Sequence, residues 1–179
     1  MILALAGGVG GAKLAHGLAR TLDPSELVIA VNTGDDFLHL DYFICPDLDS
    51  VLYKLAGIND TERGWGIRDE TWNFMESLKK IGGEDWFQLG DKDLATHIER
   101  TRRLTEGQTL SEVTHALCQQ HKIVHSIVPM TDHRVGTVVD TKDGDFFFQD
   151  YFVRLRCEPA FTGVHYKGME GAVPAPQFE

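Results

Sequence analysis

The first 31 residues constrain the fold more than any other part of the chain. A short apolar segment, residues 2–6, runs directly into a glycine-rich loop at residues 7–11. Leucines then recur at every fourth position within residues 12–22, which gives a helix one apolar face. Residues 27–31 are apolar and rich in β-branched side chains, as in a buried strand. Strand, glycine turn, helix and strand in this order predict a right-handed βαβ unit with parallel strands.

The rest of the chain alternates helical and extended patterns. Cys45-Pro46-Asp47 resembles a helix start, with proline at the first helical position. Further helices are predicted over residues 69–81, 93–104 and 109–120, and residues 123–130 return to strand character. Helices that follow a βαβ unit and precede another strand are typical of an α/β protein.

A β-hairpin is expected late in the chain. Residues 135–140 and 146–152 have strand character and flank Lys142-Asp143-Gly144, which is a strong hairpin turn sequence. We therefore predict an α/β fold with a Rossmann-like, mostly parallel sheet, a helical insertion and a late hairpin. The predicted core comprises residues 1–60 and 121–179, and the predicted insertion comprises residues 61–120.

Composition excludes several classes of protein. The chain has 17 lysines and arginines against 27 aspartates and glutamates, so its net charge of −10 does not suit binding to nucleic acid. No segment approaches the ~20 consecutive apolar residues of a membrane span, and the amino-terminal sequence does not resemble a signal peptide. The three cysteines are far apart and odd in number, which favours a cytoplasmic protein without disulfides or a zinc site.

The glycine-rich loop is the first candidate binding element. Its glycines are Gly7, Gly8, Gly10 and Gly11, and Lys13 follows them. Free amides at the start of a helix favour a phosphate or another anion, and a lysine beside them adds positive charge. The spacing matches neither the dinucleotide-binding pattern nor the P-loop. Anion binding is favoured, and tight packing of the helix on the strand is the alternative.

A group of acidic residues follows the second predicted strand. No lysine or arginine occurs between positions 20 and 54, although seven acidic residues lie there. Asp35 and Asp36 follow the strand at its carboxyl end, where open α/β sheets bind ligands. Asp47 and Asp49 lie at the next helix start. If these acids converge, a divalent cation such as Mg²⁺ would hold them together. The alternatives are a solvated acidic turn and, for Asp47, a simple helix cap.

Charges of both signs also cluster around residue 91. Asp91 and Lys92 lie at the start of a predicted helix, and Asp93 and His97 share one of its faces. Lys92 or His97 suits a phosphate, whereas Asp91 suits a helix cap. Each residue alone is more often structural, so the hypothesis of a binding site depends on the cluster as a whole.

Several motifs together are similar to those of one known family. They are Gly7-Gly8-Val9-Gly10-Gly11-Ala12-Lys13-Leu14, Asn32-Thr33-Gly34-Asp35-Asp36, Ile44-Cys45-Pro46-Asp47-Leu48-Asp49, Arg63-Gly64-Trp65-Gly66-Ile67, Leu89-Gly90-Asp91-Lys92-Asp93-Leu94-Ala95-Thr96-His97 and Phe148-Gln149-Asp150-Tyr151-Phe152-Val153. In this order they resemble the 2-phospho-L-lactate transferase family of coenzyme F-420 biosynthesis, including its bacterial phosphoenolpyruvate-using members. The resemblance spans essentially the whole chain.

The resemblance implies a Mg²⁺-dependent transfer of a phosphorus-containing group. The donor would be a guanosine diphosphate (GDP) adduct of 2-phospholactate or phosphoenolpyruvate, with a weak preference for enolpyruvate. The acceptor would be the terminal ribityl hydroxyl of the deazaflavin Fo, and GMP would be released. The resemblance also implies a cytoplasmic homodimer.

The resemblance further implies roles for individual residues. The glycine loop and Lys13 would hold the donor phosphates. Asp35 and Asp49 would be catalytic and would bind Mg²⁺, with Asp36 behind them. The residues placed at the substrates are Asp36, Asp49, Asp91, Lys92 and His97. The helical insertion would cover the acceptor ring, with Trp65 or Trp86 nearby.

Two other functions are compatible with parts of the sequence. The gluconeogenesis-factor family, which binds a nucleotide sugar and regulates, is similar in the glycine loop and the paired acids. Its acids would be followed by glycine and serine, whereas residues 37–42 here are largely apolar and aromatic. A dehydrogenase that binds nicotinamide adenine dinucleotide is disfavoured because the third glycine of its fingerprint is replaced by Lys13.

The resemblance implies a chain longer than 179 residues. A Pro-Ser-Asn-Pro-type loop expected to hold the donor nucleotide does not occur in this sequence. We therefore expect this chain to be truncated and to transfer poorly.

Overall fold

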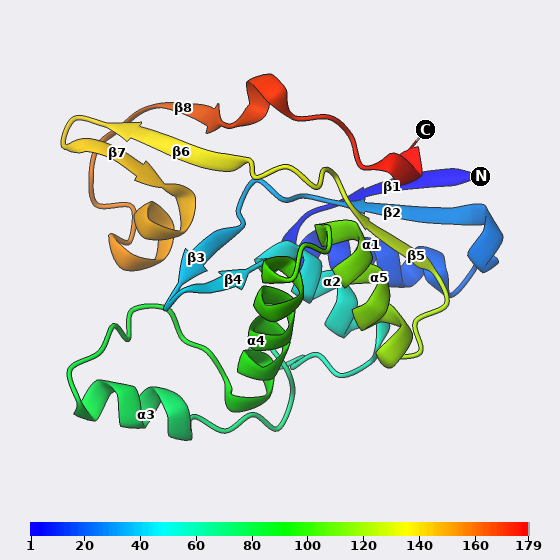
Figure 1. Ribbon diagram of the computed structural model, residues 1–179, viewed down its shortest axis with the longest axis horizontal. Helices are drawn as coiled ribbons and strands as arrows, with labels where there is room; N and C mark the ends of the chain where they lie inside the picture. Colours follow the sequence, from blue (N-terminus) through cyan, green and yellow to red (C-terminus); the bar gives the residue numbers. More distant parts are fainter. Residues whose placement is uncertain (179) are drawn as a thin grey trace.

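A three-stranded parallel sheet forms the centre of the fold in the computed structural model, which describes residues 1–178 (Figure 1). Its strands are β1 (Ile2–Ala6), β2 (Leu27–Val31) and β5 (Ser126–Pro129), in the order β1-β2-β5. Leu3 pairs with Val28, and Ala30 pairs with Val128. The predicted βαβ unit and the α/β fold class are therefore confirmed.

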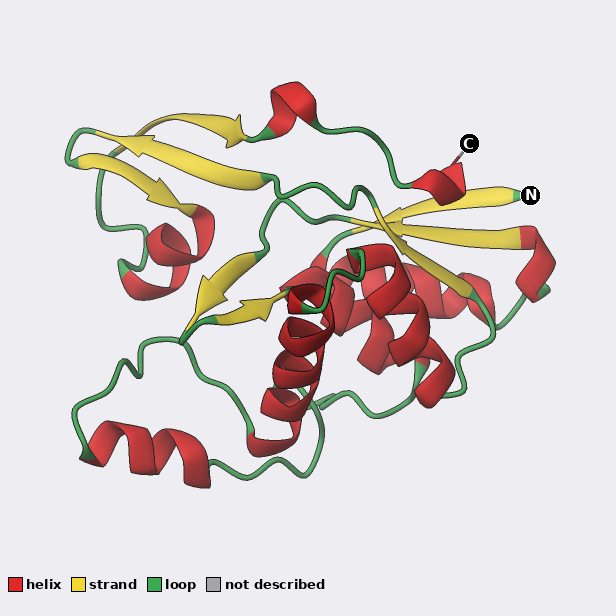
Figure 2. Cartoon of the chain, viewed as in Figure 1, coloured by secondary structure: helices red, strands yellow, loops and turns green. Residues whose placement is uncertain are grey.

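Three helices cover one face of this sheet (Figure 2). They are α1 (Gly8–Ala19), α2 (Pro46–Leu55) and α5 (Leu110–Gln120). Alternate strand residues, among them Ala4, Ile29 and Ile127, pack against them in the main core. The helix predicted to start at Cys45-Pro46-Asp47 begins at Pro46, as the sequence indicated. The predicted domain division places α5 in the insertion, but α5 packs on the sheet.

The helical insertion has its own small core. Its helices are α3 (Asn73–Lys80) and α4 (Asp91–Thr105). Met75 of α3 packs with Leu89, Leu94 and Ile44, and these four side chains are buried. The helix predicted from residue 69 begins only at Asn73, because Asp69 has a left-handed backbone with φ 53°.

A tight β-hairpin that the sequence did not predict precedes α2. Strand β3 (Phe37–His39) pairs with β4 (Tyr42–Ile44) in antiparallel fashion. Leu40 and Asp41 connect the two strands, and both have positive φ angles of 51° and 61°. Such a turn usually contains asparagine or glycine, so Leu-Asp carries no turn signal.

The late hairpin belongs to a second, antiparallel sheet. Strands β6 (Gly136–Thr141), β7 (Gly144–Phe147) and β8 (Phe161–Lys167) have the order β7-β6-β8. The predicted hairpin turn is confirmed, but the strand predicted to continue to residue 152 ends at Phe147. Residues Asp150–Arg154 instead form a helical turn, which the Asp150–Arg154 ion pair spans with an N–O distance of 2.7 Å.

The remaining elements are short. Single 3₁₀ turns occupy Pro24–Glu26, Met169–Gly171 and Pro176–Phe178. Within residues 1–178, no helix combines the length and the apolar character needed to cross a membrane.

Candidate functional site

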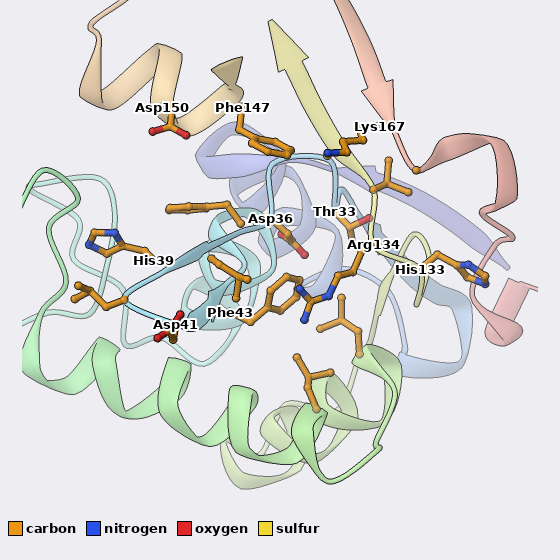
Figure 3. A pocket seen from close by; sticks show the side chains of 18 of the residues that line it. Thr33, Asp36, His39, Asp41, Phe43, His133, Arg134, Phe147, Asp150 and Lys167 are labelled. Carbon is orange, nitrogen blue, oxygen red and sulfur yellow. The ribbon is translucent and has the colours of Figure 1, made fainter. Parts of the chain in front are cut away.

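A cavity of about 1060 Å³ lies beside the carboxyl end of β2 (Figure 3). The β3–β4 hairpin, the loop around Trp86, the segment before β6, and strands β7 and β8 contribute to its walls. Asp36, which follows β2, is one of the residues that line this cavity, and Figure 3 labels it. The cavity therefore lies where an open α/β sheet is expected to bind a ligand.

Asp36 is the most unusual carboxylate of the site. Both of its oxygens are buried, and no hydrogen bond of ordinary geometry reaches either of them within residues 1–178, although the Cys45 thiol lies close enough to lower the pKa. Burial raises the pKa of Asp36 well above its ordinary value, and the opposing effects of the Cys45 thiol and the Arg100 guanidinium are smaller. Because an unpaired buried carboxylate is unfavourable, Asp36 is suited to a proton, a cation or a hydrogen-bonding ligand.

Asp35 lies beside Asp36 and faces a third acid. Burial raises the pKa of Asp35, and the charge of Asp47 raises it further, whereas the Thr137 hydroxyl lowers it. Thr137 is fixed because its amide donates to the carbonyl of Gly34 over 2.6 Å. Asp35, Asp36 and Asp47 are called the acid cluster below. The sequence left open whether the acids converge here or form a solvated turn, and it assigned no binding role to Asp47.

The glycine-rich segment predicted as a loop is the start of α1, which begins at Gly8, and it contacts the carboxylate of Asp47. A Cβ atom at Gly7 or Gly8 would lie 3.3 Å from an Asp47 carboxylate oxygen. Asn32 donates to the same carboxylate over 2.9 Å. Burial raises the pKa of Asp47, against the lowering effects of Asn32 and the Gly8 backbone. The protein's own carboxylate thus lies at the helix start where the sequence predicted a bound anion.

Two other glycines of this segment differ in their surroundings. A Cβ at Gly11 would lie 2.8 Å from the Cα of Ala6, so Gly11 allows α1 to pack closely on β1. A Cβ at Gly10 would meet no atom within 4 Å among the described residues. Lys13 lies away from the acid cluster, in a separate small cavity of about 170 Å³ that Lys54 and Trp65 also line.

Asp49 belongs to a buried charge network, and its charge also raises the pKa of Asp36. Arg100 donates to both of its oxygens, and one of these bonds is 3.0 Å long. Nδ1 of His97 lies 3.6 Å from Asp49, and Nε2 of His97 lies 3.4 Å from Asp93. Tyr53 donates to Asp93 over 2.5 Å. The predicted metal pair Asp35 and Asp49 therefore have different partners.

The buried charge network is a connection between α2 and α4. Only 2% of Arg100 and 2% of His97 are exposed. Burial acts to lower the pKa of Arg100, but Asp49 together with Cys45 and Tyr53 more than compensates and the pKa is raised. Burial acts to raise the pKa of Asp93, and His97 and Tyr53 outweigh it, so this pKa is lowered. His97, predicted as a substrate ligand, thus contacts acids of the protein.

Asp91 and Lys92 interact with the chain that precedes α3. The Asp91 carboxylate accepts from the Thr71 hydroxyl over 2.7 Å and from the Phe74 amide over 3.0 Å. The Thr71 hydroxyl and the Phe74 amide lower the pKa of Asp91 to about 2. The Lys92 ammonium donates to the carbonyl of Asp69 over 2.6 Å. Both side chains hold the insertion in place, and neither lines the large cavity.

The large cavity has an aromatic end and a cationic end. Phe37, His39 and Trp86 line the aromatic end, and the centroids of the His39 and Trp86 rings lie 5.0 Å apart. Arg134 and Lys167 line the other end. The guanidinium of Arg134 lies over Phe43, and the ammonium of Lys167 lies over Phe147. In Figure 3, Asp36 lies between His39 on one side and these two cationic groups on the other.

Sequence reasoning missed most of the cavity walls. His39 lies on an unpredicted strand, and Lys167 lies on another. Arg134 lies in a loop that no motif includes. The sequence did contain one signal for the aromatic end, namely the apolar and aromatic residues that follow the paired acids.

Comparison with known proteins identifies the family. Residues 2–177 match the 2-phospho-L-lactate transferase CofD family. The chain belongs to this family. A match over nearly the whole chain agrees with the resemblance that the motifs carry.

Curated relatives of this CofD-family chain are phosphoenolpyruvate transferases. The Streptomyces coelicolor protein is 45% identical over 180 residues, which cover 98% of this chain and 56% of the relative. The Mycolicibacterium smegmatis protein is 41% identical over 191 residues, which cover 98% of this chain and 58% of the relative. The chain thus spans little more than half the length of these relatives.

A solved structure shares the fold of this CofD-family chain. It is a UPF0052-family protein from Bacillus halodurans, which matches with a TM-score of 0.58 over 98% of this chain and 53% of that chain. Its sequence identity is 13%, so this likeness concerns the fold alone.

Proposed function

We propose that this chain contains the acceptor site and the cation-binding acids of a phosphoenolpyruvate transferase. In the proposed reaction, the phosphoenolpyruvate moiety of a GDP adduct moves to the terminal ribityl hydroxyl of the deazaflavin Fo, and GMP leaves. The observation that carries the proposal is the position of Asp36, on a cavity wall between aromatic and cationic ends. Family membership and the names of the relatives favour enolpyruvate over 2-phospholactate as the transferred unit.

The acid cluster suits a Mg²⁺ ion. Asp36 has two buried oxygens without partners in residues 1–178, and Asp35 is half-buried beside it. Carboxylate oxygens are the ligands that Mg²⁺ prefers. We propose that Asp35 and Asp36 hold the ion, with Asp47 behind them. Asp49 is less suited, because both of its oxygens already accept hydrogen bonds from Arg100. The bound ion would neutralise charge on the transferred phosphoryl group.

The chain's own residues would position the two substrates. The aromatic end of the cavity offers ring faces and edges to a planar acceptor ring. Arg134 and Lys167 offer positive charge to the donor's phosphates. We propose that Asp35 accepts the proton of the attacking hydroxyl, since burial and the charge of Asp47 raise its pKa. In-line positioning and charge neutralisation suffice for this chemistry, which requires no protein nucleophile.

Release of GMP tests the proposal. The purified chain is mixed with Fo, Mg²⁺ and the GDP adduct, and the products are separated by chromatography. Stoichiometric GMP and the phosphodiester of the deazaflavin with enolpyruvate are the expected result, with a rate below that of a full-length relative assayed in parallel. An Asp36→Asn variant should lose at least 100-fold in rate. Binding of the nucleotide without any GMP release, even from the full-length relative, contradicts the proposal and favours a regulatory nucleotide-binding protein.

A further inference from the structure

His39 is a buried polar residue that the proposed chemistry does not use. It is the last residue of β3, in the hairpin that follows the acid cluster. Only 2% of it is exposed, yet it lines the large cavity. Figure 3 shows it at the end of the cavity opposite Lys167. The hairpin turn at Leu40 and Asp41 thus brings an imidazole to the aromatic end.

The Nε2 atom of His39 has no hydrogen-bond partner among residues 1–178, although it is fully buried. A buried ring nitrogen without a partner is unfavourable, and in native proteins such an atom is rare without a functional reason. Burial lowers the pKa of His39, and the charge of His97 lowers it slightly further. The charges of Glu84 and Asp150 act in the opposite direction and do not outweigh burial. The uncharged ring has one donor and one acceptor nitrogen, so it can satisfy either type of ligand atom.

Aromatic rings surround the imidazole. Trp86 lies edge-on at 5.0 Å and Phe87 lies edge-on at 5.8 Å from the ring centroid of His39, and Phe37 lies at 6.4 Å. None of these three side chains offers Nε2 a hydrogen-bond acceptor, and the indole of Trp86 can only donate. An occupant of this end of the cavity therefore meets mainly ring surfaces, with the carboxylates of Glu84 and Asp150 in the same cavity lining.

We propose that Nε2 of His39 forms a hydrogen bond with the polar edge of the acceptor's planar heteroaromatic ring. The inference rests on the proposed function, and it makes His39 the residue that selects a ring with a hydroxyl, carbonyl or ring nitrogen at that edge. Phe37, Trp86 and Phe87 would fix the orientation of the ring, and His39 would fix its position along the cavity. A site with a buried polar atom rejects ligands that leave this atom unpaired.

Direct binding of Fo tests this inference without requiring turnover. The fluorescence of the deazaflavin is titrated with the full 179-residue chain and with His39→Phe, His39→Gln and His115→Phe. His39→Phe keeps an aromatic ring but removes the nitrogen, whereas His39→Gln restores a polar atom. His115 is an exposed residue of α5 and is the matched control. Thermal unfolding of each variant is recorded, and GDP binding is titrated in parallel.

The expected result is a selective loss of acceptor affinity. His39→Phe should weaken Fo binding at least 10-fold, His39→Gln should recover part of that loss, and GDP affinity should stay unchanged. Equal Fo affinity of the wild-type chain and His39→Phe overturns this inference and leaves the proposed function intact. If the wild-type chain binds no Fo, the proposed acceptor site and this inference both fail.

A second measurement observes the imidazole of His39 in the wild-type chain directly. In the wild-type chain labelled with ¹⁵N-histidine, Fo should shift the Nε2 resonance of His39, assigned through His39→Gln. GDP alone should leave it in place. An Nε2 resonance that Fo does not move overturns the inference.

Discussion

At the residue scale, the candidate site combines one carboxylate that is fully paired with one that is not. Asp49 accepts from Arg100 on both oxygens, whereas Asp36 has no hydrogen-bond partner within the described chain. A buried charge with a partner is tolerated because the partner replaces water, and a buried charge without one is not. The two aspartates are therefore expected to respond in opposite ways to neutralising substitutions.

Removal of Arg100 should strongly destabilise the fold. Arg100→Met leaves Asp49 buried without its partner, and breaking a buried ion pair on one side costs about 3–5 kcal/mol. Urea denaturation should therefore show a much lower free energy of unfolding. Arg102→Met, on the exposed side of the same helix, should leave the transition nearly unchanged because its partners Glu99 and Glu106 are themselves solvated. Equal stability of the two variants contradicts this assignment.

Neutralisation of Asp36 should stabilise the metal-free chain above acidic pH. The folded pKa of Asp36 is raised, so folding is favoured while the group is protonated and this contribution is lost as the pH rises through the folded pKa. Asparagine does not ionise, so Asp36→Asn should not lose this stability as the pH rises. Its Tm should exceed that of the wild type at pH 7.5, by about 2–4 °C per kcal/mol gained, and the difference should vanish near pH 4.

Mg²⁺ gives the control for this experiment. It should raise the Tm of the wild-type chain, since a ligand that binds only the folded state stabilises it. It should not raise the Tm of Asp36→Asn. A Tm difference between the two proteins that is independent of pH contradicts the raised pKa.

At the element scale, periodic segments were predictable and irregular ones were not. The βαβ unit, α2, α4, α5 and the late hairpin turn follow from apolar spacing, glycines and caps. The β3–β4 hairpin and β8 carry no such local signal, and Asp150–Arg154 forms a helical turn despite its aromatic sequence. Because these unpredicted segments supply the cavity walls, the sequence indicated the acids but not the shape of the site.

The β3–β4 turn contains strain that a substitution can relieve. Asp41 has a φ of 61°, a conformation that glycine adopts without steric cost. Asp41→Gly should therefore stabilise the chain by up to about 1 kcal/mol, measured by thermal unfolding. Asp143→Gly is the matched control, because Asp143 also lies in a hairpin turn but has no positive φ. Asp143→Gly should leave stability unchanged or lower it, and a gain from Asp143→Gly alone would contradict the explanation.

At the scale of the whole molecule, the parallel sheet has two unequal faces. The helices α1, α2 and α5 all lie against the face that includes Ala4 and Ile29 (Figure 2). On the opposite face, Leu3 is 54% exposed and Leu5 is 71% exposed. Parallel sheets are normally covered on both faces, so in this chain, which spans little more than half the length of its relatives, the second face exposes apolar surface.

The exposed face should make the chain prone to self-association. The double variant Leu3→Thr, Leu5→Thr introduces β-branched side chains at both positions, so the strand should persist while the apolar surface shrinks. Light scattering and the fluorescence of an apolar dye should both fall by about half or more, with little change in Tm, because these side chains contribute little to the core. Ile81→Thr is the control, since Ile81 is exposed but lies beyond the sheet, at the end of α3. If Ile81→Thr lowers both signals as much as the double variant does, the association does not depend on the sheet face.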